Sequence, residues 1–435
     1  MIIGIDGNEA NIEKKVGVGK YAYELLWQLY KNQKSSFGKP FGTSSGRGLR
    51  MMLSKVEASK LILRQTQDDA EQSRGIKTQN YNFKLKIYLK DKPLPDLPKE
   101  TDWWQYKMVG PGKLWTQIGL PLALFEESLL KDCRLGVFFT PTHYAPRFCP
   151  CPNVVSIMDL SFLYFPRMFK KQDLWQLKNW TAYSIRKASK VLTISESSKR
   201  DIIEYYQIPE DQVVVTYPGY DMLKLKSQNS NLKTIREKYG IESEYILSVG
   251  TLQPRKNFVR LIEAFKNIKY HLPAGGSNIK KQDENIKLVI VGKKGWLYQE
   301  ILDAPNKFGI QGEVKFLDYV PDEDLAGLYK GARCFVLVSL YEGFGLPVLE
   351  AMSLGCPVVV SNVSSLPEVA GEAGVLVNPN DLQDIAKGIG KVLKMNSEER
   401  NMMIQKGLKQ AKKFSWEKCA KETLRILEEV ADQKS

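Results

Sequence analysis

Residues 334–352, CFVLVSLYEGFGLPVLEAM, indicate an apolar strand, then a turn with two glycines, and then a helix. Pro347 suits the first turn of that helix, and Gly343 and Gly345 let the backbone turn sharply below it. Free amides at such a helix start, together with the positive end of the helix dipole, favour a diphosphate or a sugar hydroxyl. The stretch therefore predicts an open α/β sheet with a ligand site where a strand ends.

The same alternation of short strands and amphipathic helices continues through most of the 435 residues. A chain of this length is too long for one ordinary core, so the pattern predicts two Rossmann-like doubly wound domains. The expected strands are 2–7, 83–89, 135–141, 153–159, 190–196 and 212–218 in the first half, and 245–251, 286–292, 313–319, 334–339, 356–362 and 374–379 in the second. The expected helices lie near 18–32, 172–187, 197–206, 258–268 and 322–332, with a last one from 415 onward.

The domain boundary is predicted where PGY breaks the strand pattern, which gives an N-terminal domain over 1–218 and a C-terminal domain over 219–414. Residues 415–435 are predicted to form a last helix that begins at a serine cap and packs back across both domains. Residues 34–80 interrupt the pattern with a polar stretch that has little apolar face to bury. We expect a disordered surface insertion there, with an acceptor-binding loop as the alternative.

Composition narrows the class of protein. The 63 Lys and Arg against 49 Asp and Glu give a net charge of +14, which suits phosphates, nucleic acid or an anionic membrane face as partners. Lysines on the solvent-exposed faces of amphipathic helices are the simpler explanation of this positive charge. The basic residues are dispersed and lack the clustered pattern of a nucleic-acid-binding protein. Six scattered cysteines, no membrane-length apolar run and an opening without leader features predict a cytoplasmic protein, at most peripheral at the inner membrane face.

Charged side chains gather at two predicted strand ends in the second half. Glu342 lies in the glycine turn and Glu350 about one turn into the helix, where carboxylates can accept hydrogen bonds from sugar or ribose hydroxyls. GTLQPRKN, residues 250–257, follows another strand, and its Arg255 and Lys256 can neutralise a leaving diphosphate. Surface ion pairs and a solvated basic loop are the structural alternatives, but the Gly and Pro pattern favours a ligand site.

The first half offers weaker candidates. Gly17 and Gly19 in VGVGKYAYELL follow the first strand and open a helix, so their backbone can approach a phosphate, and a packing turn explains them equally well. His143 in TPTHYAP and Asp159 in SIMDL each follow a strand and are candidates to face the same crevice. A histidine that bonds loop backbone and a turn-forming aspartate are the alternatives.

These motifs resemble the retaining glycosyltransferases of family 4 (group 1), which have the GT-B fold, in their bacterial mannosyltransferase-like branch. The most specific mark is the pair Glu342 and Glu350 with GFGLPVL between them, supported by GTLQPRKN and by SWEKCAKETL near the end. The resemblance covers nearly everything outside residues 34–80. It implies two domains facing a cleft, with a nucleotide-diphosphate sugar held by the second domain and the acceptor by the first.

The resemblance also implies the reaction. A hexose, mannose being favoured and GDP-mannose the preferred donor, passes to a glycan or lipid-linked acceptor with its anomeric configuration kept and without a metal or other cofactor. Arg255 and Lys256 would hold the diphosphate, Glu350 the ribose and Glu342 the transferred sugar. The residues expected around the donor are Gly17, Gly19, Arg255, Lys256, Tyr319, Val320, Leu325, Glu342, Gly343, Phe344, Gly345, Leu346 and Glu350, and those expected to carry catalysis are Glu342, Arg255, Lys256, His143 and Asp159.

One position departs from the family pattern. Many relatives carry His before the residue that matches Asp159, whereas this chain has Met158, whose thioether donates no hydrogen bond, so that role is absent or moved to His143. A nucleotide-sugar epimerase is the alternative enzyme, although the chain offers few proton-handling groups for it. The acidic run 322–324 resembles a metal site, but its place after Pro321 at a helix start favours capping, so we expect no essential metal.

Overall fold

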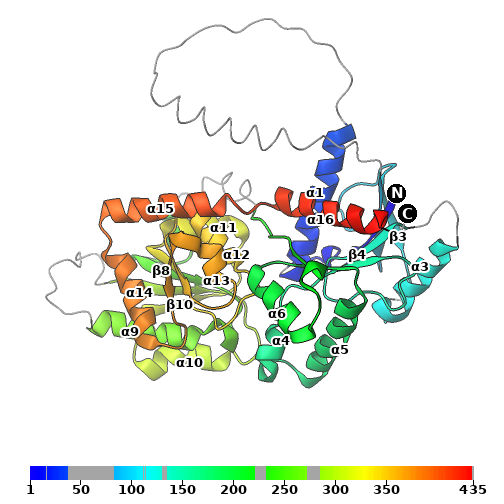
Figure 1. The fold of residues 1–435 in the computed structure, drawn as a ribbon. Coiled ribbons are helices and arrows are strands. Elements are labelled where there is room, and N and C mark those ends of the chain that lie inside the picture. The colour runs from blue at the N-terminus through cyan, green and yellow to red at the C-terminus, as the bar shows by residue number, and fades with distance from the viewer. Residues whose placement is uncertain are drawn as a thin grey trace, which may run out of the picture.

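The structure is a computed structural model that describes residues 1–15, 17–37, 83–110, 112, 114–129, 135–220, 232–271 and 285–433. Two parallel sheets, each wrapped by helices, form the two lobes of Figure 1. The predicted class of two Rossmann-like doubly wound domains is therefore confirmed. Most of the insertion predicted at 34–80 lies outside the described residues, and its first four residues continue helix α1 (Val18–Phe37).

The first sheet has the strand order β3-β2-β1-β4-β5-β6-β7, with every pair parallel. All six strands predicted in this half are present, and the edge strand β3 was missed. The strands are β1 (Ile2–Asp6), β2 (Lys84–Leu89), β3 (Trp104–Met108), β4 (Val137–Thr140), β5 (Asn153–Ser156), β6 (Lys190–Thr193) and β7 (Val213–Val215). The helices besides α1 are η1 (Asn8–Ala10), the π-helical η2 (Trp115–Gly119), α3 (Leu120–Ser128), α4 (Ser161–Tyr164), η4 (Pro166–Met168), α5 (Lys171–Lys187), α6 (Glu196–Tyr206) and η5 (Glu210–Gln212).

The second sheet has the strand order β10-β9-β8-β11-β12-β13, again parallel throughout. In both sheets the order reverses beside the first strand, between β1 and β4 and between β8 and β11, which is where open α/β sheets bind ligands. The strands are β8 (Tyr245–Val249), β9 (Lys287–Val291), β10 (Val314–Leu317), β11 (Cys334–Leu337), β12 (Val358–Ser361) and β13 (Gly374–Val377). The helices are α8 (Leu232–Lys238), η6 (Pro254–Lys256), α9 (Phe258–His271), α10 (Gln299–Phe308), η8 (Gln311–Glu313), α11 (Asp322–Gly331), α12 (Leu346–Ser353), α13 (Leu366–Ala370), η9 (Gly371–Ala373), α14 (Leu382–Lys394) and α15 (Ser397–Ala411).

The last helix, α16 (Trp416–Asp432), returns from the second lobe to the first (Figure 1). Ser415 caps it by accepting a hydrogen bond from the amide of Lys418 at 3.1 Å. Its Trp416 packs on Tyr21 of α1, with 5.7 Å between the ring centroids. A Cβ on Gly219 would lie 2.0 Å from the amide nitrogen of Trp416, so only glycine fits at position 219, where the chain passes the start of α16. Among the described helices, none is long and apolar enough to cross a bilayer.

Candidate functional site

The donor-side candidates lie in two loops at the carboxyl edge of the second sheet. Residues 250–257 follow β8, and residues 338–345 follow β11, its neighbour where the strand order reverses. The amide of Leu340 donates to the carbonyl oxygen of Arg255 at 2.9 Å, and the guanidinium of Arg255 donates to the carbonyl oxygen of Tyr341. The two loops therefore form one hydrogen-bonded unit at the expected ligand crevice.

Glu342 forms a buried charge cluster with Lys256 and Arg255. Nζ of Lys256 lies 2.5 Å from its Oε1, and NH1 of Arg255 lies 3.3 Å from its Oε2. The hydroxyl of Ser339 donates to the same Oε1 at 2.6 Å. Burial alone would raise the pKa of the Glu342 carboxyl, but Lys256 and Arg255 outweigh burial and lower the pKa to about 2. Burial alone would lower the pKa of the Arg255 guanidinium, but Glu342 and then Asp159 of the first domain outweigh burial and raise the pKa, so a second carboxylate also faces this cluster.

Asn257 positions the two cations, and the sequence did not identify it as a site residue. Its φ of 63° lies in the left-handed region, which Asn adopts more readily than most residues. Its Nδ2 donates to the carbonyl oxygens of Val338 at 2.9 Å and Pro379 at 2.8 Å, which ties the β8 loop to the ends of β11 and β13. The signal that could have found it is an Asn between a basic pair and an apolar helical run.

The glycine turn before α12 lies against the first domain. A Cβ on Gly343 would lie 2.8 Å from Oδ2 of Asp159 and 3.2 Å from the carbonyl oxygen of Met158, so this approach requires glycine. Gly345 has a φ of 109°, and Pro347 occupies the first turn of α12. The predicted strand, turn and helix are therefore present, and the turn brings backbone from one domain beside a carboxylate of the other.

Some predicted donor contacts have side chains in the core. Phe344 is buried, with its ring centroid 5.5 Å from that of Phe414. Val320 is buried in the same core, and Leu325 and Leu346 pack against it while partly exposed. The side chains of Phe344 and Val320 therefore stabilise the domain, which leaves only their backbone atoms to reach a ligand.

Glu350 meets the first domain through Lys20 of α1. Nζ of Lys20 lies 3.9 Å from Oε1 of Glu350 and 3.6 Å from Oδ2 of Asp322. The hydroxyl of Tyr329 donates to Oε2 of Glu350 at 3.1 Å. Burial raises the pKa of the Glu350 carboxyl, and Lys20 opposes that rise. Lys20 was not predicted as a site residue, although it directly follows Gly19 in the glycine stretch that opens α1.

The acidic run 322–324 forms the first turn of α11, but the capping interpretation is wrong. The N-cap is Pro321, and no side-chain capping bond is present. Asp324 instead accepts hydrogen bonds from Nζ of Lys238 and the hydroxyl of Tyr239, both at 2.6 Å. Within the described ranges, no group of three or more His, Cys, Asp or Glu side chains is placed to hold a metal ion.

His143 and Asp159 lie together at the carboxyl edge of the first sheet. Nε2 of His143 is 3.5 Å from the carbonyl oxygen of Asp159, and Oδ1 of Asp159 accepts from the amide of Ser161 at 2.8 Å. Burial lowers the pKa of the His143 imidazole, against a smaller opposing effect of Asp159, which favours the neutral ring. Met158 is buried in the core of the first sheet, so its side chain serves packing.

The two glycines at the start of α1 have different roles. Gly17 has a φ of 52°, and a Cβ there would meet no atom within 4 Å. Gly19 lies inside α1, where a Cβ would be 2.9 Å from the carbonyl oxygen of Glu9. Gly19 is therefore a packing glycine against η1, whereas Gly17 supplies the positive φ of the turn.

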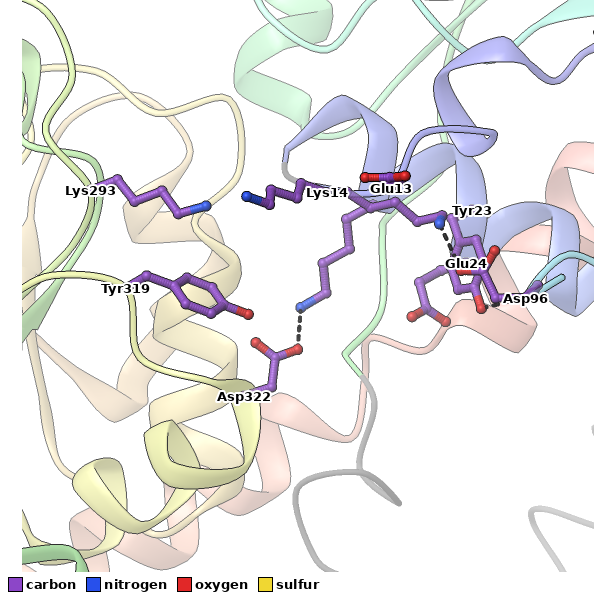
Figure 2. A pocket seen from close by; sticks show the side chains of 10 residues that line it. Glu13, Lys14, Tyr23, Glu24, Asp96, Lys293, Tyr319 and Asp322 are labelled. Carbon is purple, nitrogen blue, oxygen red and sulfur yellow. Dashed lines mark hydrogen bonds and ion pairs between the residues drawn. The ribbon is translucent and has the colours of Figure 1, made fainter. Parts of the chain in front are cut away.

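A cavity of about 560 Å³ lies between the two domains beside this turn. Lys14 comes from the first domain and faces Lys293 and Tyr319 of the second (Figure 2). Nζ of Lys293 lies 4.6 Å from the centre of the Tyr319 ring, and Tyr319 is 61% exposed. Lys15 and Lys20 also line the cavity. Its size is within the range of small-molecule sites, and its four lysines are matched by four acidic side chains, Glu13, Glu24, Asp96 and Asp322, so its lining carries no net positive charge.

Contacts on the other side of the crevice join the domains. The carboxylate of Glu368 in α13 accepts from the amide of Glu196 at the start of α6 at 2.9 Å and from the hydroxyl of Tyr217 at 2.5 Å. The hydroxyl of Tyr341 donates to Oδ2 of Asp201 in α6, also at 2.5 Å. A carboxylate at the positive end of a helix is favourable, so these contacts stabilise the interface between the two domains.

Known proteins match both the sequence and the fold. Residues 232–410 match the family described as glycosyl transferases group 1. The O-antigen chain mannosyltransferase B of Escherichia coli is 34% identical over 296 residues, which are 68% of this chain and 74% of that protein. The serotype-specific mannosyltransferase WbdA of Escherichia coli is 32% identical over 237 residues, which are 54% of this chain and 28% of WbdA.

Solved structures extend the likeness over nearly the whole chain. A sucrose-phosphate synthase from Thermosynechococcus elongatus superposes with a TM-score of 0.66 at 15% identity, covering 99% of this chain and 98% of that one. HepE of Anabaena in complex with UDP-glucose superposes with a TM-score of 0.64 at 16% identity, covering 98% and 99%. At these identities the likeness concerns the fold alone. Together with the family match and the Escherichia coli relative, it establishes that the chain is a GT-B glycosyltransferase that belongs to the glycosyl transferases group 1 family.

Proposed function

We propose that this glycosyltransferase moves mannose from a nucleotide-diphosphate mannose, GDP-mannose being favoured, to a glycan or lipid-linked acceptor with retention and without a metal. The observation that carries the proposal is the charge cluster of Arg255, Lys256 and Glu342 where the second sheet reverses its strand order. The names of two relatives state mannosyl transfer, which supports the choice of sugar. The epimerase and nucleic-acid alternatives find no comparable support.

The charge cluster would stabilise the leaving group. Breaking the bond between the anomeric carbon and the phosphate oxygen leaves negative charge on the diphosphate, which Arg255 and Lys256 neutralise from fixed positions. Glu342 keeps both cations oriented before the donor arrives. Glu350 would accept hydrogen bonds from the ribose, and the exposed ring of Tyr319 would lie against the base.

The acceptor would approach from the first domain, past His143 and Asp159. Asp159 contacts the glycine turn at Gly343, so an acceptor hydroxyl held there lies next to the transferred sugar. In a same-face substitution the acceptor oxygen forms the new bond to the anomeric carbon while a leaving phosphate oxygen takes its proton. The neutral imidazole of His143 can hydrogen-bond a sugar hydroxyl during this step.

The first test is thermal stabilisation by GDP, UDP, ADP and their sugars, with the wild type and Arg255→Ala. A donor at about 100 times its Kd adds about 2.7 kcal/mol of stability, enough to raise the melting temperature by several degrees. We expect one nucleotide to give this rise in the wild type and in Arg425→Ala, a surface control on α16, but not in Arg255→Ala. No rise with any nucleotide would contradict the donor site.

Retention and metal independence need a product assay. With GDP-mannose and a mannan-type acceptor, we expect equimolar GDP and an α-mannoside, identified from the anomeric proton and carbon couplings in NMR spectra. The rate should be unchanged by excess EDTA. An inverted product would contradict the same-face mechanism, and an isomerised nucleotide sugar without GDP release would favour an epimerase.

A further inference from the structure

An apolar face runs along the outside of η2 and α3. Leu114, Ile118, Leu122, Phe125 and Leu129 recur at intervals of three or four residues, so they share one side of this helical segment. Each exposes between 44% and 70% of its surface. A contiguous apolar face of this kind on a soluble domain marks an interaction surface.

The opposite side of α3 is fixed on the first sheet. Leu124 is buried there, and so is the carboxylate of Glu127. Glu127 accepts hydrogen bonds from the hydroxyl of Tyr88 at 2.5 Å and from Nζ of Lys86 and Lys107 at 3.1 and 2.9 Å. Rotating the helix would leave this buried carboxylate without its three partners, which is strongly unfavourable for a buried charge. The apolar side is therefore held outward.

Phe148 extends the apolar face toward α5. The amide of Arg147 donates to a carbonyl oxygen of η2 at 2.9 Å, and the amide of Phe148 donates to the hydroxyl of Tyr183 in α5 at 3.2 Å. Phe148 is 81% exposed. Arg186 and Lys187, three and four residues on from Tyr183, are exposed on the same side of α5. The apolar face therefore lies next to basic side chains.

The chain that follows the apolar face is strongly basic, although the face itself carries the exposed Glu126 next to Phe125. Residues 135–190 contain eight Lys and Arg but only Asp159 and Asp173 as acids. A second copy of the chain would bring like charges together at this surface, whereas an anionic bilayer supplies both an apolar layer and negative headgroups. The apolar face also begins beside the crevice, since the indole of Trp115 donates to Oδ2 of Asp6, the last residue of β1, at 3.3 Å.

We propose that an apolar ridge, formed by Leu114, Ile118, Leu122, Phe125, Leu129 and Phe148, docks this glycosyltransferase on an anionic lipid bilayer. The ridge enters the boundary between headgroups and acyl chains, and the basic side chains of α5 contact the headgroups. Docking is a property separate from glycosyl transfer, and it places the carboxyl edge of the first sheet near the membrane surface.

Flotation with lipid vesicles tests the proposal. Vesicles of phosphatidylethanolamine with about a third phosphatidylglycerol bind the wild type. The double variant Leu122→Ser with Phe125→Ser lowers the partition coefficient roughly 100-fold, because the apolar area that these two side chains bury in the bilayer is lost. Met402→Ser is the matched control, since Met402 is an apolar side chain on α15 of the second domain and is 54% exposed. It leaves the partition unchanged.

A charge variant separates the two contributions. Arg186→Ser with Lys187→Ser lowers binding to the anionic vesicles tenfold or more, because each of the two basic side chains contributes about tenfold or less to the affinity. The weaker binding to phosphatidylcholine vesicles stays unchanged. Unchanged thermal melting and unchanged transfer to a soluble acceptor show that both double variants are folded. The proposal is overturned if the wild type does not float, if the ridge variant floats like the wild type, or if light scattering shows a dimer that the ridge variant abolishes.

Discussion

Replacing Glu342 by Gln tests the electrostatics of the charge cluster. The substitution keeps the size of the side chain and an acceptor for Ser339, but removes the charge that faces Lys256 at 2.5 Å and Arg255 at 3.3 Å. The two buried cations then lose the carboxylate that contacts both of them, and Asp159 remains as a second negative charge acting on Arg255. We therefore expect a lower free energy of unfolding at neutral pH.

The expected magnitude follows from the pKa. The Glu342 carboxyl has a pKa of about 2 in the folded protein against its usual 4.5. Because the folded pKa is lowered, the stabilisation is fully present above pH 4.5 and is lost as the pH falls toward 2. The difference between the two pKa values corresponds to about 3 kcal/mol at pH 7 and roughly 1 kcal/mol at pH 3.

Urea unfolding followed by tryptophan fluorescence measures this difference for wild type and Glu342→Gln from pH 7 to pH 3. The two proteins share every other titrating group, so their difference isolates position 342. We expect a gap of about 3 kcal/mol at pH 7 that narrows as the pH falls. A gap that stays constant with pH, or one below about 1 kcal/mol at pH 7, would refute the reasoning.

Three further substitutions test other parts of the account. Gly343→Ala places a methyl group against Asp159 and is expected to lower kcat/KM about 100-fold with little change in melting temperature, as steady-state kinetics and calorimetry can show. Glu368→Gln removes the charge at the start of α6, which should lower stability by about 1 kcal/mol and increase the radius of gyration in X-ray scattering. An unchanged radius would contradict its role in holding the two domains together. Glu350→Gln should raise the donor KM roughly tenfold or more with kcat preserved. Because the pKa of Glu350 is raised, the donor affinity of the wild type should begin to fall, as the pH is lowered, at a higher pH than it would with an ordinary carboxyl group.

Local sequence patterns predicted the fold well because buried parallel strands are continuous apolar runs. All six strands of the second sheet and six of the seven in the first were found this way. The missed strand, Trp104–Met108, is an edge strand in which Trp, Gln, Tyr, Lys and Met alternate, so it has no apolar run. The π-helical turn at Trp115–Gly119 was also missed, because its conformation depends on packing beneath α3 and not on a helical period.

The candidate site could be located from the sequence, but its pairings could not. The turn around Gly343 and the basic pair of the β8 loop were both assigned to strand ends. That Glu342 pairs with Lys256 follows from the left-handed backbone of Asn257 and from the adjacency of β8 and β11. The contact of Lys20 with Glu350 depends on how the two domains meet, which no local pattern encodes.

The central claim is that Arg255 and Lys256 hold the donor diphosphate during mannosyl transfer. The most direct measurement is kcat/KM for GDP and mannoside formation from GDP-mannose by the wild type, Arg255→Ala, Lys256→Ala and the surface control Arg425→Ala. Loss of one charge-assisted contact of about 1.5–3 kcal/mol predicts a fall of roughly 10- to 100-fold in each site variant and none in the control. Wild-type rates in both site variants would contradict the account.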